Sequence, residues 1–142
     1  MKRIVPILLS MLLLTACTAP QISESDSNSI KNESETEKIT YRQISVAQAI
    51  AMMEEESGYI ILDVRTPEEF AEKRIPNSIN VPNESIGNGE ISELPNKQQL
   101  ILVYCRSGRR SKEAAQKLCE LGYTNIVEFG GIIDWTGDTV SG

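Results

Sequence analysis

Two short and almost wholly apolar runs constrain the fold of this chain more than any other feature. One run is Tyr-Ile-Ile-Leu-Asp-Val at residues 59–64, and the other is Leu-Ile-Leu-Val-Tyr at residues 100–104. Each has the length of a strand but lacks the polar/apolar alternation of a half-exposed one. Strands of this kind are covered on both faces, as in a parallel sheet. We therefore expect two inner strands of a sheet with helices on both faces.

Helix signals separate these strands. The signals are a capping box of Ser45 and Gln48, Thr66 followed by Pro67 at a first helical position, and a one-sided apolar face over residues 111–121. Further strands are expected at residues 79–81 and 125–129. Strands that alternate with helices predict an α/β domain with a central, mostly parallel sheet.

The N-terminus carries the signals of export and of lipid attachment. Lys2 and Arg3 precede an apolar stretch, Ile4 to Leu14, which is too short to span a bilayer and is typical of a secretory signal peptide. The stretch ends in Leu-Thr-Ala-Cys, which resembles a bacterial lipobox, where the Cys17 thiol is lipidated and the chain is cut before it. The alternative is an ordinary signal peptide with a chance cysteine.

The chain is accordingly divided into three parts. Residues 1–16 are expected to form a lipoprotein signal peptide, residues 17–38 a lipidated Cys17 with a disordered tether, and residues 39–142 one folded domain. The tether is rich in Ser, Glu, Asn and Thr and buries too little apolar surface to fold. This organisation predicts an extracytoplasmic lipoprotein of the cell envelope, anchored to the membrane through its acyl chains.

Composition excludes several function classes. The formal net charge of −6 argues against nucleic acid as a partner, because such binding needs many clustered Lys and Arg. The chain has no His, so mechanisms with a His base or His metal ligands are not available. Three cysteines do not form a disulfide framework. We expect neither a metal nor an organic cofactor.

The predicted chemistry lies where the second apolar run ends. Cys-Arg-Ser-Gly-Arg-Arg at residues 105–110 leads directly into the helix expected at 111–121. Ligands gather at the carboxyl ends of strands, Gly108 permits a positive φ, and inward-facing amides at a helix start bind anions. Three arginines add positive charge, so the thiolate form of Cys105 should be favoured. The alternative, a packing cysteine on a solvated turn, gives no reason for this glycine and these arginines.

The same loop resembles the active-site loop of rhodaneses, the sulfurtransferases, in the pattern Cys-Arg-Ser-Gly-Arg-Arg-Ser. Three further segments resemble the family in order and spacing: Asp-Val-Arg-Thr-Pro-Glu-Glu-Phe at 63–70, Ile-Pro-Asn-Ser-Ile-Asn-Val-Pro at 75–82, and Gly-Gly-Ile-Ile-Asp-Trp at 130–135. The similarity covers roughly residues 40 to 136. Two residues depart from the family pattern, Arg74 in place of His and Asn77 in place of Gly. Asn tolerates the left-handed backbone that this turn would need.

The resemblance implies a fold, a reaction and residue roles. The fold is rhodanese-like, and Cys105 would take sulfur from a small anion such as thiosulfate, carry it as a persulfide, and pass it to a thiol or cyanide. Residues Arg106, Ser107, Gly108, Arg109 and Arg110 would bind the substrate and the persulfide. Asp63 and Arg65 would shape the pocket, with Arg65 paired to Glu69, although capping and surface ion pairing explain them equally well.

Two other functions remain open from the sequence. A cysteine phosphatase needs five residues between Cys and Arg, whereas four separate Cys105 from Arg110, which makes a smaller cradle. The domain could instead sense persulfides or oxidants through an exposed Cys105 thiol, or bind another envelope protein. Cys119 is expected to pack beside Ala115 rather than to pair with Cys105, because it lies about two helical turns further on.

Overall fold

The sheet is built around the two apolar runs. A computed structural model describes residues 40–142, so Cys17, the predicted signal peptide and the predicted tether lie outside the described residues. Five parallel strands lie in the order β1-β5-β4-β2-β3. Their bounds are β1 Arg42–Gln43, β2 Ile60–Asp63, β3 Ile79–Asn80, β4 Ile101–Cys105 and β5 Ile126–Gly131. The two runs form β2 and β4, and both are inner strands, which confirms the prediction.

Within residues 40–142, three α-helices and one 3-10 helix lie between the strands, and a second 3-10 helix follows β5. They are α1 Val46–Glu55, α2 Pro67–Glu72, η1 Asn83–Ser85, α3 Arg109–Glu120 and η2 Ile132–Asp134. Both predicted N-caps are present, because Ser45 and Thr66 each accept a hydrogen bond from a backbone amide in the first turn and complete a capping box. In contrast to the prediction, α3 begins two residues before Ser111. Gly108 precedes it with a φ of 98°, which lets the chain turn into the helix directly after the loop.

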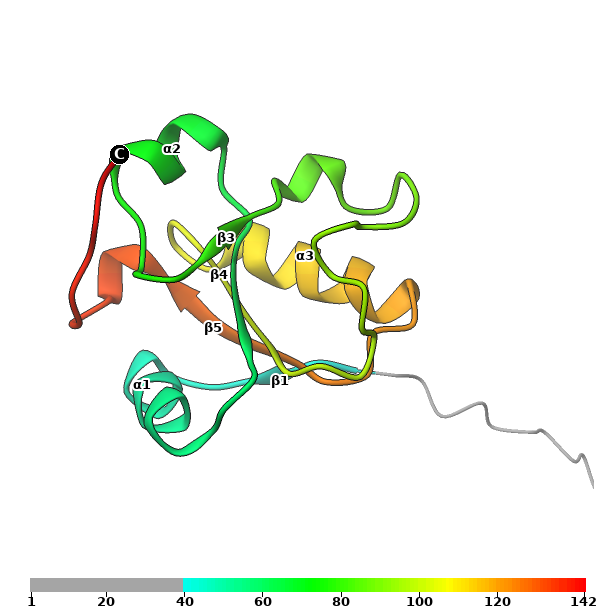
Figure 1. Cartoon of the computed structure of the whole chain (residues 1–142), viewed down its shortest axis with the longest axis horizontal. Coiled ribbons are helices and arrows are strands. Elements are labelled where there is room, and N and C mark those ends of the chain that lie inside the picture. Colours follow the sequence, from blue (N-terminus) through cyan, green and yellow to red (C-terminus); the bar gives the residue numbers. More distant parts are fainter. Residues whose placement is uncertain (1–39) are drawn as a thin grey trace, which may run out of the picture. The chain divides into compact units, whose positions relative to one another are not determined.

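The two faces of the sheet have separate apolar cores, and this separation decides where each β4 side chain points. Ile101, Val103 and Cys105 pack with the buried face of α3. Leu102 and Tyr104 point the other way and pack with the α1 side. Figure 1 shows α1 and α3 on opposite sides of the sheet, as predicted for a parallel sheet. Cys105 therefore lies on the α3 face.

The C-terminal segment returns to α2. Val140 pairs with Arg74 in an antiparallel bridge, and the Gly142 amide donates to the Ala71 carbonyl, which places the C-terminus beside α2 (Figure 1). Asn77 has a φ of 62°, so the left-handed turn expected from its sequence is confirmed. Trp135 is partly buried and packs on the α1-side core. No helix within residues 40–142 is both long and apolar enough to cross a membrane.

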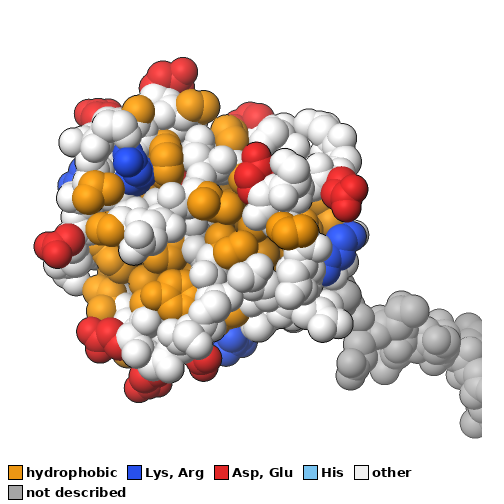
Figure 2. Space-filling model, in the orientation of Figure 1, with side chains coloured by type: hydrophobic (Ala, Val, Ile, Leu, Met, Phe, Trp, Pro, Cys, Tyr) orange, Lys and Arg blue, Asp and Glu red, His pale blue; other side chains and the backbone are white. Residues whose placement is uncertain are grey.

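Apolar and acidic side chains are distributed unevenly on the surface. Figure 2 shows apolar side chains across the middle of the viewed face, with acidic side chains mostly around its edge. The most exposed large apolar side chain among the described residues is Ile133, at 62% of its accessible area. Ile133 lies in η2, directly after the strand that borders the Cys105 loop.

Candidate active site

Cys105 is the last residue of β4, and its thiol points into the loop that follows it. The residue is only 1% exposed, which corrects the expectation of an exposed thiol. Its Sγ accepts a hydrogen bond from the Gly108 amide over 3.1 Å. The first amides of α3 come next, and they have no intrahelical carbonyl to bond. The sulfur thus sits where backbone N–H groups and the positive end of a helix converge, an arrangement that stabilises an anion.

The loop rests directly on the end of β5. Cys105 lies opposite Gly131 after an irregularity in the pairing of β4 with β5. A Cβ atom at Gly131 would overlap the Arg106 carbonyl and lie 2.6 Å from the Ser107 Cα. The Ile133 amide then donates to the Arg106 carbonyl over 3.3 Å. Gly131 is therefore needed for the close approach of two backbones, whereas Gly130 has a φ of 93°, which favours glycine.

The three arginines of the loop have different partners. Arg110 makes two hydrogen bonds, of 2.7 and 2.9 Å, with the Glu69 carboxylate of α2. This contact raises the pKa of Arg110 and lowers the pKa of Glu69 to about 2. Arg109 pairs with Glu113 one turn further along α3, at an exposed position. Arg106 is exposed and forms no ion pair within residues 40–142.

Asp63 and Arg65 form a buried pair at the end of β2. Arg65 donates to both carboxylate oxygens of Asp63 and to the Lys73 carbonyl, which ties β2 to the end of α2. The expected pairing of Arg65 with Glu69 is wrong, because Glu69 is taken by Arg110. The side chains of Asp63 and Tyr104 lie on the same face of the sheet. Burial and the Asp63 carboxylate raise the pKa of Tyr104 to about 12. Of this pair, Arg65 alone reaches the cavity described next.

A groove opens beside the Cys105 loop, between α2 and η2. We call it the α2–η2 groove. It has a volume of about 420 Å³, and its lining consists of Arg65, Glu69, Glu72, Lys73, Arg106, Ile132 and Ile133. Arg106 connects it to the loop, since this residue follows Cys105 directly.

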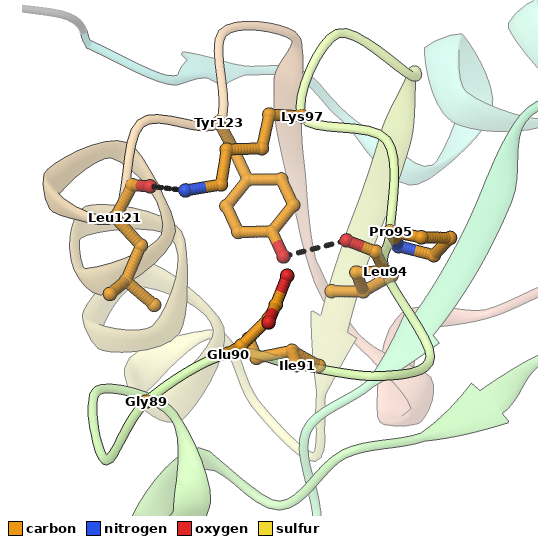
Figure 3. Close-up of a pocket in the computed structure, with 8 residues that line it drawn as sticks. All are labelled: Gly89, Glu90, Ile91, Leu94, Pro95, Lys97, Leu121 and Tyr123. Atoms are coloured by element: carbon orange, nitrogen blue, oxygen red, sulfur yellow. Dashed lines mark hydrogen bonds between the residues drawn. The ribbon is translucent and has the colours of Figure 1, made fainter.

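A second hollow lies at the far end of α3, away from the sulfur. Tyr123, Leu94 and Lys97 line this cavity of about 180 Å³, together with Leu121 from the end of the helix (Figure 3). The Tyr123 hydroxyl donates to the Leu94 carbonyl, and the Lys97 ammonium donates to the Leu121 carbonyl. The helix between this hollow and the loop has twelve residues and spans about 18 Å. The hollow at the far end of α3 is therefore not part of the candidate active site.

Glu128 is a site residue that the sequence interpretation missed. It is in β5, 2% exposed, and faces α3. Its Oε1 accepts hydrogen bonds from the Ser111 hydroxyl at 2.6 Å and from the Gly130 amide at 2.8 Å. A carboxylate under the loop thus fixes the first turn of α3 to the end of β5. The signal that could have revealed it is a charged residue inside a strand covered on both faces, because such a charge requires buried partners.

The described residues do not assemble a metal site. Within residues 40–142, His, Cys, Asp and Glu side chains form no group of three that could hold an ion. Cys105 and Cys119 are both free thiols. Cys119 is buried in the same core as Ala115, as predicted. Burial raises the pKa of the Cys119 thiol, which disfavours its thiolate form, whereas the Cys105 Sγ accepts a hydrogen bond from a backbone amide.

Comparison with known proteins agrees with this geometry. The chain is 33% identical over 81 residues to "Thiosulfate sulfurtransferase PspE" of Escherichia coli, covering 57% of this chain and 78% of that protein. It is 37% identical over 92 residues to "Sulfurtransferase" of Allochromatium vinosum, covering 64% and 81%. The solved structure "rhodanese with anions from E. coli" superposes with a TM-score of 0.55 at 32% identity, covering 59% of this chain and 99% of that one.

The match to a family model extends over most of the folded part. Residues 45–138 match the model described as the rhodanese-like domain. This span includes the strand end that carries Cys105, the loop with its three arginines, and the Gly-Gly pair beneath it. The chain belongs to the rhodanese family.

Proposed function

We propose that this protein is a sulfurtransferase that carries sulfur as a persulfide on Cys105. The observation that carries the proposal is the position of the Cys105 Sγ. This sulfur accepts a hydrogen bond from the Gly108 amide at the start of α3. The relatives named as sulfurtransferases support the same reaction class.

In the first half-reaction, the Cys105 thiolate attacks the outer sulfur of a donor such as thiosulfate. The S–S bond of the donor breaks, sulfite leaves with the electron pair, and Cys105 becomes a persulfide anion. The Gly108 amide and the first amides of α3 would hold this anion, and Arg106 would attract the donor. In the second half-reaction, a thiol or cyanide takes the outer sulfur and restores the thiolate.

The test is the intact mass of a folded fragment, residues 39–142, after incubation with thiosulfate. A gain of about 32 Da, one sulfur atom, is expected, and cyanide or dithiothreitol should reverse it. Cys105→Ser should gain nothing, whereas Cys119→Ser should gain the same mass. If the folded wild-type domain stays unmodified with Cys105 free, thiosulfate sulfurtransferase activity is wrong and a sensing or binding role is the better explanation.

We further propose that the domain acts in the cell envelope, held to the membrane by a lipid on Cys17. The support is the sequence at residues 14–17, together with the positive and apolar residues before it. Expression of the full chain in bacteria fed labelled palmitate tests this. Label should enter the wild-type chain and the membrane fraction, and Cys17→Ser should abolish both. An unlabelled wild-type chain would exclude the lipid anchor.

A further inference from the structure

We propose that Glu113 of α3 is a specificity-determining residue that limits how strongly the Cys105 loop attracts doubly charged sulfur donors. Glu113 has this effect because it neutralises Arg109, so the loop has less free positive charge than its three arginines suggest. The inference rests on the persulfide chemistry proposed above. It adds a residue outside the loop that sets how sulfur uptake depends on the charge of the donor.

The contact between Arg109 and Glu113 is short, although it lies at a position where ion pairs are usually weak. Arg109 Nη1 donates to Glu113 Oε1 over 2.6 Å, while 74% of the Arg109 side chain and 44% of the Glu113 side chain are exposed. Exposed pairs one helical turn apart contribute little, and a basic residue four positions before an acidic one is the less favourable order. A fixed contact here therefore needs a further partner that holds the Glu113 carboxylate.

That further partner is Asn83 of η1, which is only 5% exposed. Asn83 Nδ2 donates over 3.0 Å to Oε2, the other carboxylate oxygen of Glu113. The Lys117 ammonium donates to Asn83 Oδ1 at 3.2 Å, and because an ammonium only donates and a carboxylate only accepts, the amide nitrogen must face Glu113. The backbone amide of Asn83 donates to the Val64 carbonyl, directly after β2. Glu113 is thus held by a buried side chain that is tied to the sheet.

These contacts reduce the positive charge that the loop presents to an anion. Arg110 is paired with Glu69. Arg109 is paired with Glu113, and Arg106 is the loop arginine that forms no ion pair within residues 40–142. The Coulomb energy of an approaching anion is proportional to its charge, so a fixed carboxylate beside the loop disfavours a doubly charged donor more than a singly charged one.

The experiment compares sulfur uptake from two donors that differ in charge. Thiosulfate carries two negative charges, and methanethiosulfonate carries one. With either donor, the Cys105 thiolate attacks the outer sulfur, the S–S bond breaks, and sulfite or methanesulfinate leaves with the electron pair. The second-order rate constant of persulfide formation is measured for the wild type and Glu113→Gln in about 10 mM salt, where the Debye length is about 30 Å. Each donor is compared only with itself, so its intrinsic reactivity cancels.

We expect Glu113→Gln to take up sulfur from thiosulfate about threefold faster than the wild type, and from methanethiosulfonate faster by less than about twofold. The maximal rate at saturating donor should stay unchanged, because the substitution alters the approach of the donor and not the chemical step. Salt at about 1 M should remove both gains, because the Debye length falls to about 3 Å. The double variant Arg109→Gln/Glu113→Gln should return to the wild-type rates, since no released arginine remains.

Glu120→Gln is the matched control on the same helix. Glu120 is an exposed carboxylate that accepts a hydrogen bond from Gln116 and forms no ion pair within residues 40–142, so both rates should stay unchanged. The inference is overturned if Glu113→Gln reacts like the wild type, if both donors gain equally, or if the double variant keeps the full gain. A wild-type protein that takes up sulfur from neither donor would instead contradict the proposed function itself.

Discussion

The Ser111 hydroxyl donates a 2.6 Å hydrogen bond to the Glu128 carboxylate, and this bond joins the first turn of α3 to the interior of β5. Ser111 is fully buried, and its partner is nearly so. The loop that carries Cys105 begins at the end of β4 and ends at this turn. The bond therefore fixes one end of the loop against the neighbouring strand.

Removal of the Ser111 hydroxyl should destabilise the fold. Ser111→Ala leaves a buried carboxylate with only the Gly130 amide as donor, and we expect a loss of about 1–3 kcal/mol in the free energy of unfolding. Glu128→Gln should cost less, because its amide oxygen still accepts both hydrogen bonds. The double variant should cost less than the sum, since both changes act on one contact. Urea unfolding of the four proteins measures this coupling.

Ser85→Ala is the control for that series. The Ser85 hydroxyl donates to the Pro82 carbonyl at an exposed turn, so the change should stay within about 0.5 kcal/mol. Strictly additive effects of the Ser111 and Glu128 changes would show that their hydrogen bond contributes no coupling energy.

Gly131 should be intolerant of any side chain. The Cβ of Gly131→Ala would meet backbone atoms of Arg106 and Ser107, which cannot swing away as a flexible side chain would. We expect a loss of about 1–3 kcal/mol in stability and a displaced loop, with sulfur loading from thiosulfate slowed at least tenfold. Gly137→Ala is the control for a clash outside the loop: its Cβ would lie 2.9 Å from the Trp135 ring, so that ring must shift, but sulfur loading should stay normal. Normal loading by Gly131→Ala would contradict close packing of the loop on β5.

Arg106 and Arg109 should differ in how they attract an anionic donor. Arg109 is paired with Glu113, whereas Arg106 has no such partner among the described residues and lies nearer in sequence to Cys105. We expect Arg106→Gln to raise the KM for thiosulfate about five- to tenfold and Arg109→Gln about twofold at most. Steady-state kinetics at low and high salt check this, because the larger effect should shrink as salt screens the charge. Equal increases in KM for the two variants would show that Arg106 does not attract the donor more strongly than Arg109.

Local signals in the sequence were sufficient for much of the fold. The capping boxes at Ser45 and Thr66 and the unbroken apolar runs are short-range features, and each had the predicted outcome. The left-handed residue Asn77 and the position of Cys105 at a strand end are equally local. The reason is that caps, turns and buried strands are specified within a few residues.

The partners of charged residues could not be predicted in this way. Arg65 and Glu69 are four residues apart, but Arg65 precedes the N-cap of α2 and is not helical, so the helical spacing rule does not apply. Glu69 instead bonds Arg110, 41 positions away in the chain. The burial of Glu128 likewise depends on α3 packing over β5, which only the tertiary structure shows.

The Glu69–Arg110 ion pair should make stability depend on acidity in a defined range. The hydrogen bond from Arg110 lowers the pKa of Glu69 from an ordinary 4.5 to about 2. A carboxylate whose pKa is lower in the folded state stabilises the fold above its unfolded pKa, and this contribution disappears as the pH falls through the folded value. The stabilising effect of Glu69 should therefore be complete above about pH 5 and lost progressively between about 4.5 and 2.

Comparison of the wild-type domain with Glu69→Gln across this range isolates that effect. At pH 7 the variant should be less stable by about 1 kcal/mol, a figure kept small because solvent reaches a quarter of the Glu69 side chain and screens the pair. The two unfolding curves should approach each other as the pH falls below 4.5 and converge only near pH 2. Glu54→Gln, which breaks no ion pair within residues 40–142, should show no such convergence. A difference between wild type and Glu69→Gln that stays constant from pH 7 to pH 2 would mean that the ionised carboxylate is not the stabilising group.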